Sequence, residues 1–147
     1  MAVYYCEDET ALDSTADTAL NVTSNSGTAH RGRILEVHCT FETPSDFTSP
    51  LIVALTTTTG TGSAPTIEPA DPNDRAAQAT ATGNCSSEPT TGDRLLRLNL
   101  YHRIALIYKI PETRPWIWPA TANNGIGASC SHASTTTNYL IGMVWEE

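Results

Sequence analysis

Residues 33–42, RILEVHCTFE, alternate between apolar and polar side chains. The apolar members of this run are Leu35, Val37, Cys39 and Phe41. Successive side chains of a β-strand point to opposite faces, so a period of two predicts a strand with one buried face. We therefore expect the apolar side of this segment to lie in the core.

Similar runs occur along the rest of the chain, at residues 51–55, 96–100, 104–110 and 139–145, with weaker ones at 3–6 and 19–22. In the first of these, Leu51, Val53 and Leu55 share one face. About seven short strands separated by Thr/Gly/Pro/Asn loops predict an all-β fold, either a β-sandwich or a jelly roll, as a single domain over residues 1–147. The one candidate helix is residues 72–81, which follows the cap-then-proline pair Asp71-Pro72.

A tract without an evident period follows the strand at 51–55. Residues 56–82 read TTTTGTGSAPTIEPADPNDRAAQATAT. Long loops are uncommon in small domains, and where they occur they usually carry function or lie against a partner. We expect this Thr/Gly/Pro-rich loop to lie flat on another protein.

Composition narrows the classes of function. The 147 residues include only 16% charged side chains, carry a formal net charge of -8, and contain a single lysine, Lys109. Binding to nucleic acid or to an anionic membrane needs clustered Lys and Arg, so we expect neither. A basic and apolar leader is not evident at Met1, and no apolar run reaches about 18 residues, so we expect synthesis in a cytoplasm.

The four cysteines, Cys6, Cys39, Cys85 and Cys130, are too sparse for a disulfide scaffold, so we expect free thiols with Cys39 in the core. A metal site at Cys130-x-His132 is one interpretation, and an incidental Cys and His in a polar loop is the other. Serines and threonines are too abundant for pairing with histidine to indicate a catalytic triad. We expect no enzymatic activity, metal or cofactor.

Two further segments have alternative interpretations. Asp71, Asp74 and Glu68 are oxygen ligands suited to calcium, but their order matches no EF-hand, and Asp beside proline favours a turn. Residues 115–119, PWIWP, place Trp116 and Trp118 on one face if extended. They are candidates for a sugar-stacking platform, a subunit interface or a core edge shielded by prolines.

The order of these features resembles a family of small virion proteins of tailed bacteriophages. The resemblance covers roughly residues 34–147 and rests on three short segments, GSAPT at 62–66, PADPNDRAA at 69–77 and GMVWEE at 142–147. The resemblance implies a capsid decoration (cement) subunit. Such subunits are β-sandwich or jelly-roll modules, often trimeric, that tie neighbouring capsomers together on the head.

From the resemblance we expect a structural protein on the capsid surface, with the major capsid protein and further copies of itself as partners. The alternative is a receptor- or glycan-binding module of a tail or head fibre. The residues that we expect at the interface are Thr58, Gly60, Gly62, Pro65, Ile67, Pro69, Trp116 and Trp118.

Overall fold

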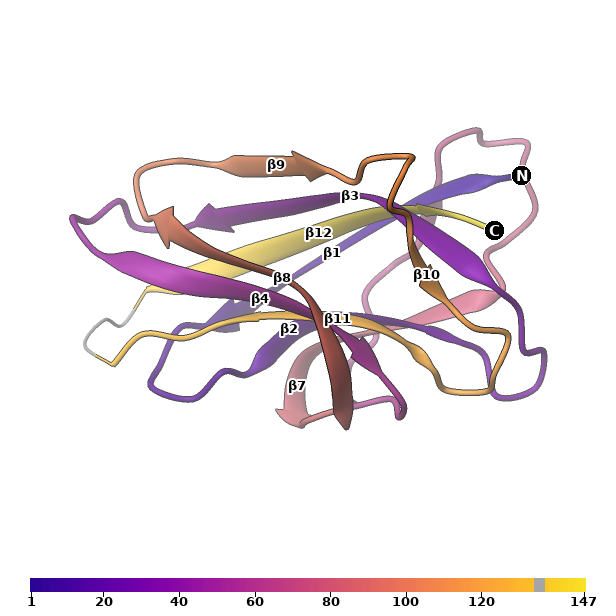
Figure 1. Cartoon of the computed structure of the whole chain (residues 1–147), viewed down its shortest axis with the longest axis horizontal. Coiled ribbons are helices and arrows are strands. Elements are labelled where there is room, and N and C mark those ends of the chain that lie inside the picture. The colour runs from indigo at the N-terminus through magenta and orange to yellow at the C-terminus, as the bar shows by residue number, and fades with distance from the viewer. Residues whose placement is uncertain (134–136) are drawn as a thin grey trace.

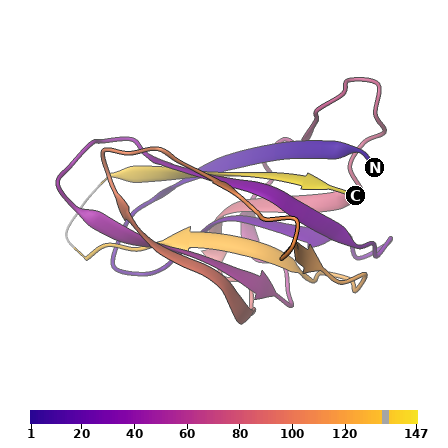
Figure 2. The same ribbon diagram turned by 45° about the horizontal axis from the view of Figure 1, so that its top comes forward.

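The chain folds into two antiparallel sheets packed face to face, as Figure 1 and the turned view of Figure 2 show. The structure is a computed structural model that describes residues 1–133 and 137–147. No helix forms within these residues. The prediction of an all-β sandwich is therefore confirmed.

Each sheet contains six strands, and both draw on the whole length of the chain. Sheet A has the order β10-β3-β12-β1-β6, and β9 pairs with the same edge of β3 as β10 does. Sheet B has the order β5-β7-β2-β11-β4-β8. The strands of sheet A are β1 (Val3–Ala11), β3 (Gly32–Phe41), β6 (Glu68–Pro69), β9 (Leu106–Lys109), β10 (Trp116–Trp118) and β12 (Asn138–Glu146). The strands of sheet B are β2 (Thr18–Ser24), β4 (Thr48–Thr56), β5 (Thr61–Ser63), β7 (Ala79–Ser87), β8 (Thr91–Tyr101) and β11 (Gly125–Cys130).

Strands that follow one another in the sequence do not pair with each other in the described part of the chain. The chain instead passes repeatedly between the sheets, so that β1 pairs with β12 and β2 pairs with β7 and β11. The pairing of β1 with β12 places Val3 opposite Glu146, and the two ends lie side by side in Figure 1. Every register therefore depends on segments far apart in the sequence.

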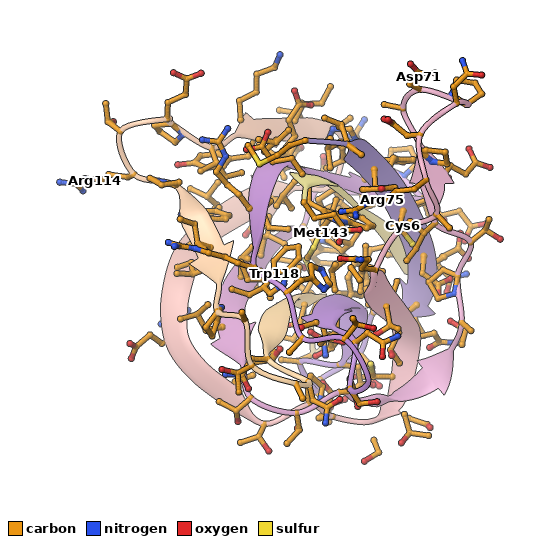
Figure 3. All side chains as sticks on the ribbon, turned by 90° about the vertical axis from the view of Figure 1, so that its right-hand side faces the viewer. Cys6, Asp71, Arg75, Arg114, Trp118 and Met143 are labelled. Atoms are coloured by element: carbon orange, nitrogen blue, oxygen red, sulfur yellow. The ribbon has the colours of Figure 1, made fainter. Side chains whose placement is uncertain are left out.

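The core lies between the sheets and is closed at one end by an indole. Trp118 of β10 and Trp145 of β12 are both fully buried. Figure 3 shows the molecule from this end, with Trp118 near the centre of the view. A Cβ on Gly32 would lie 2.0 Å from the Trp118 ring, so the absence of a side chain at Gly32 allows the indole to pack against the backbone of β3.

A β-bulge in β3 changes which side chains enter the core. The pairing of β3 with β12 is regular up to Glu36 and resumes at Ile34, so Leu35 is left out of the register. The alternation predicts Leu35 in the core, and this is wrong. Ile34 is fully buried in its place and Leu35 is only partly buried. An extra residue in a strand reverses the faces on one side of the bulge relative to the other, and here the residues before Leu35 are reversed. Val37, Cys39 and Phe41 are buried as predicted.

One other predicted core position differs, and one predicted strand begins later than expected. Leu55 is only partly buried, where the pairing of β4 with β8 becomes irregular. Ile104 is 62% exposed, because the predicted strand at 104–110 begins only at Leu106 and Ile104 lies in the turn after β8. Leu51 and Val53 are buried as predicted.

The tract at 56–82 is more regular than its sequence indicates. It contributes β5, β6 and the first residues of β7. The predicted helix at 72–81 is wrong, since Asp71 starts a turn in which the amide of Asp74 donates to its carbonyl at 2.9 Å. The side chain of Asp71 also accepts a hydrogen bond from the amide of Asn73 at 2.9 Å, which is the turn function that Asp commonly serves.

Candidate functional site

The candidate site is the connection between β4 and β7, residues 57–78, which we call the strap. It leaves β4, joins sheet B through β5, crosses to sheet A through β6 and returns to sheet B at β7. Figure 1 shows its later part as the pink loop beside the N-terminus. The strap thus provides an edge strand to each sheet on the same side of the sandwich.

The beginning of the strap crosses the outer face of β2. The side-chain amide of Asn21 donates to the carbonyl of Thr58 at 3.4 Å, and its oxygen accepts a hydrogen bond from Thr56 Oγ1 at 3.0 Å. Thr58 Oγ1 accepts a hydrogen bond from the amide of Thr90 at 2.7 Å. Asn21 is fully buried on this outer face, so β2 is covered on both sides.

The two glycines that we expected at an interface pack within the chain. A Cβ on Gly60 would lie 2.7 Å from Cys85 Sγ, and one on Gly62 would lie 2.1 Å from the carbonyl of Gly83. No side chain fits at that distance from backbone, so Gly62 is required for the close approach of β5 to β7. The glycine content of the tract is thus explained by packing inside the molecule.

The second half of the strap is attached to β1. Pro69 pairs with Tyr4, and the amide of Ala70 donates to the carbonyl of Val3 at 2.7 Å. The hydroxyl of Tyr4 donates to the carbonyl of Arg75 at 3.0 Å. Ile67 is partly buried and packs against the core. The strap is therefore held along its length by hydrogen bonds and apolar contacts.

The strap nevertheless exposes most of its residues. Residues 57–59, 61–64 and 70–76 are exposed, as are Thr66 and Glu68. Of the residues that we expected at an interface, Thr58 and Gly62 are exposed, whereas Gly60, Pro65, Ile67 and Pro69 are half-buried. The side chain of Asp71 projects from the molecule in Figure 3. The strap therefore forms an ordered, exposed surface that consists largely of small residues.

Negative charge gathers where the strap meets β1. A pocket at this junction is lined by Tyr5, Cys6, Glu7, Thr66 and Glu68. The hydroxyl of Tyr5 donates to the carboxylate of Glu7. Burial and this hydrogen bond raise the pKa of Tyr5, so its phenol stays protonated at neutral pH.

The two tryptophans at 116 and 118 do not lie on the surface. Trp116 is 9% exposed and Trp118 is fully buried, and the ring of Trp116 stacks on that of Tyr108 at 5.7 Å. A sugar-stacking platform or an anchor for another subunit needs an exposed ring, and neither ring is exposed in the single chain. The remaining interpretation, a core edge, agrees with the structure.

The cysteines and histidines that the sequence suggested as metal ligands are separated. Cys130 faces Cys39 across the core, whereas the ring of His132 lies 4.8 Å from that of Phe47. Among residues 1–133 and 137–147, no three His, Cys, Asp or Glu side chains are grouped so that they could hold a metal ion. All four cysteines are free thiols, and Cys39 lies in the core as predicted. Cys85 and Cys130 are buried as well, although loop positions were expected for them.

The structure brings together one polar group that the sequence did not indicate. Both ring nitrogens of His102 bind serine hydroxyls, Nδ1 that of Ser45 at 2.9 Å and Nε2 that of Ser49 at 2.8 Å. His102 is 2% exposed and stacks on Phe41 at 4.0 Å. These hydrogen bonds satisfy both ring nitrogens of a buried imidazole.

Comparison of the chain with protein-family models, with curated proteins and with solved structures finds no match. In the described residues, no helix has the length and apolar content needed to cross a membrane.

Proposed function

We propose that the protein is a structural virion subunit of the capsid decoration type, which binds the major capsid protein and bridges neighbouring capsomers at the surface of a bacteriophage head. The observation that carries the proposal is the strap, which is exposed at residues 57–59, 61–64 and 70–76 although it is attached to both sheets. No nucleic acid, membrane or cofactor takes part in the proposed function.

An ordered and exposed strap is suited to binding a protein lattice. A loop that is mobile before binding loses conformational entropy when it binds, which weakens the complex. The pairing of β5 with β7 and of β6 with β1 has already fixed the strap within the free molecule. Its small exposed residues also allow a partner to approach the backbone closely.

The segments that carry the resemblance to decoration proteins lie near one another in the fold. Residues 62–66 and 69–77 belong to the strap, and residues 142–147 belong to β12 and the residue after it. β1 lies between β6 and β12 in sheet A, and the carboxylate of Glu147 accepts a hydrogen bond from the amide of Ala79 at 3.1 Å. The three segments therefore lie on one side of the molecule. Residues 142–147 are buried or half-buried there and support the two exposed segments of the strap from beneath.

The test is binding to particles. Copies of the protein are first counted in virions purified from the source that encodes it, by quantitative mass spectrometry. We expect many copies per head, and its absence from the particles would refute the proposal. The protein is then removed from the particles, added back in purified form, and measured in the sedimented fraction.

The strap is tested by arginines at exposed alanines. The variant Ala64→Arg/Ala76→Arg places two bulky charges on the strap, and Ala105→Arg/Ala120→Arg places the same charges on exposed loops elsewhere. We expect the first variant to lose particle binding and the second to retain it, with both showing the wild-type circular dichroism. Equal binding by the two variants would exclude the strap as the attachment surface.

A homotrimer is the expected assembly. Sedimentation equilibrium of the purified protein measures its mass directly, and we expect three times the 15.8 kDa of the chain. A monomer at all concentrations would contradict a stable trimer and leave assembly to the capsid surface.

A further inference from the structure

Cys39 and Cys130 face each other across the core from opposite sheets. Cys39 lies on β3 in sheet A and Cys130 is the last residue of β11 in sheet B. Their sulfur atoms are 3.9 Å apart, and the residues are 0% and 1% exposed. The two thiols are thus in contact with each other inside the sandwich.

The backbone at Cys130 is held in place by a neighbouring tyrosine. The hydroxyl of Tyr139 accepts a hydrogen bond from the amide of Cys130 at 3.0 Å and donates to the carbonyl of Asp17 at 2.5 Å. This links the end of β11 to β12 and to the segment before β2. The side chain of Cys130 is therefore presented to Cys39 by a fixed backbone.

We propose that Cys39 and Cys130 form an inter-sheet disulfide when the chain folds in the presence of a low-molecular-weight disulfide such as oxidised glutathione. The sulfurs must approach from 3.9 Å to the bonded distance of about 2.05 Å. Rotation about the Cα–Cβ bonds moves each sulfur toward the other, with a small adjustment of the strands.

The reaction takes place while the thiols are still accessible. The thiolate of one cysteine attacks oxidised glutathione, forming a mixed disulfide and releasing one glutathione thiolate. The thiolate of the second cysteine then attacks the protein sulfur of the mixed disulfide and releases the second glutathione. Two protein thiols are oxidised, one glutathione disulfide is reduced to two thiols, and the two protons pass from the cysteines to glutathione.

Once the chain has folded, both forms are protected. The hydrogen bond to Cys39, burial and the neighbouring thiol all raise the pKa of Cys130, so the reduced folded protein reacts slowly with oxidants. The disulfide, in turn, is shielded from reducing thiols by the same burial. The redox state set during folding therefore persists in the folded molecule.

The bond would restrain most of the chain. It closes a loop from residue 39 to residue 130 and joins the two sheets directly. Closing a long loop lowers the conformational entropy of the unfolded chain, so the oxidised protein is expected to unfold at higher urea concentration than the reduced protein.

The test uses the full chain. Reduced, denatured protein is refolded in glutathione buffers of increasing oxidised fraction, quenched in acid, alkylated and digested with trypsin. Cleavage after Arg31, Arg33, Arg75, Arg94 and Lys109 places each cysteine in a different peptide. We expect a covalent link between peptides 34–75 and 110–147, with Cys6 and Cys85 alkylated, and a higher urea midpoint for this species.

The variant Cys6→Ala/Cys85→Ala is the matched control and is expected to form the same link. Should that variant fail to fold, the peptide map of the wild-type protein decides the question alone. Four alkylated cysteines in the most oxidising buffer, or a mixture of pairings in the folded fraction, would overturn the proposal.

Discussion

The side-chain carboxylate of Glu147 lies 2.6 Å from Nε2 of His30, which ties the segment after β12 to the connection between β2 and β3. The same carboxylate accepts hydrogen bonds from the amides of Gln78 at 2.5 Å and Ala79 at 3.1 Å, where the strap enters β7. This side chain is only 1% exposed. One buried carboxylate thus joins three segments of the chain.

Replacement of Glu147 by alanine is expected to destabilise the protein by roughly 1–3 kcal/mol, because it leaves two amides without their acceptor. The matched control is Glu146→Ala, which removes an ion pair to Arg33 that is partly exposed to solvent. That change is expected to cost less than about 1 kcal/mol. Urea unfolding measures both, and equal effects would contradict a special role for Glu147.

Gly32 and Gly92 form a second matched pair. A Cβ at Gly32 would lie 2.0 Å from the buried ring of Trp118, whereas one at Gly92 would lie no closer than 3.7 Å to its neighbours. Gly32→Ala is therefore expected to cost roughly 1–3 kcal/mol or more, since the ring has no free space to move into. Gly92→Ala is expected to have little effect. Thermal unfolding distinguishes them, and a well-tolerated Gly32→Ala would show that the Trp118 ring is not confined.

Because of the bulge in β3, we expect truncation of Ile34 and truncation of Leu35 to destabilise the protein by different amounts. Ile34→Ala removes a fully buried side chain and is expected to cost roughly 2–5 kcal/mol. Leu35→Ala removes a partly buried one and is expected to cost clearly less. The order is the reverse of what the alternation in the sequence predicts. Measured costs in the opposite order would place Leu35 in the core and remove the bulge.

The strands that the sequence predicts well are those with one apolar face. The alternation at 33–42 and at 139–145 corresponds to β3 and β12, which pair with each other at the centre of sheet A. A strand buried on one side shows a period of two, and this period can be recognised in the sequence without knowing which strands it pairs with. The bulge at Leu35 escapes prediction because it depends on the register with β12.

The strands that the sequence missed are composed of small or polar residues. β7 reads ATATGNCSS and β11 reads GIGASC. Their core-facing residues do alternate, but apart from Ile126 they are small, so the period of two gives only a weak signal. In β11, Gly125 and Gly127 are buried at positions with little space for a side chain, so packing of backbone replaces packing of large apolar groups. From the sequence alone, a tract of small residues such as β11 is interpreted as a loop, although it forms a strand inside sheet B.

The tract at 56–82 was predicted as a loop without strands, whereas it contains β5, β6 and the first residues of β7. Its pairing with β7 and β1 comes from segments that are distant or themselves lack a signal. For the tryptophans, the sequence predicts the strand but not its surroundings. A strand such as PWIWP has an aromatic face whether that face meets solvent or the core. Only the position of β10 beside Gly32 decides between the two.

The burial of the tryptophans gives an optical prediction. Trp118 and Trp145 are fully buried and Trp116 is 9% exposed. Acrylamide is therefore expected to quench the fluorescence of the folded protein far less than that of the urea-unfolded protein. Adding mono- or oligosaccharides is expected to leave the emission unchanged. Quenching that rises with sugar concentration and then saturates would favour the glycan-binding alternative.

The last prediction concerns pH. Burial, followed by the neighbouring charge of His132, lowers the pKa of His102 from its ordinary value of 6.5. Between the folded and unfolded pKa values, the unfolded chain binds more protons at this residue than the folded chain does. Its contribution to stability is therefore complete above about pH 6.5 and is lost as the pH falls through the folded-state pKa.

Urea unfolding at a series of pH values from about 8 to about 5 measures this contribution, because carboxylates ordinarily titrate below that range. We expect the free energy of unfolding to decrease toward the acidic end, and to decrease less in His102→Gln. The glutamine keeps an amide that can hydrogen-bond to Ser45 or Ser49 but does not titrate. Identical pH profiles for the two proteins would show that His102 accepts a proton as readily when folded as when unfolded, and the serine contacts would then have to rearrange around an imidazolium.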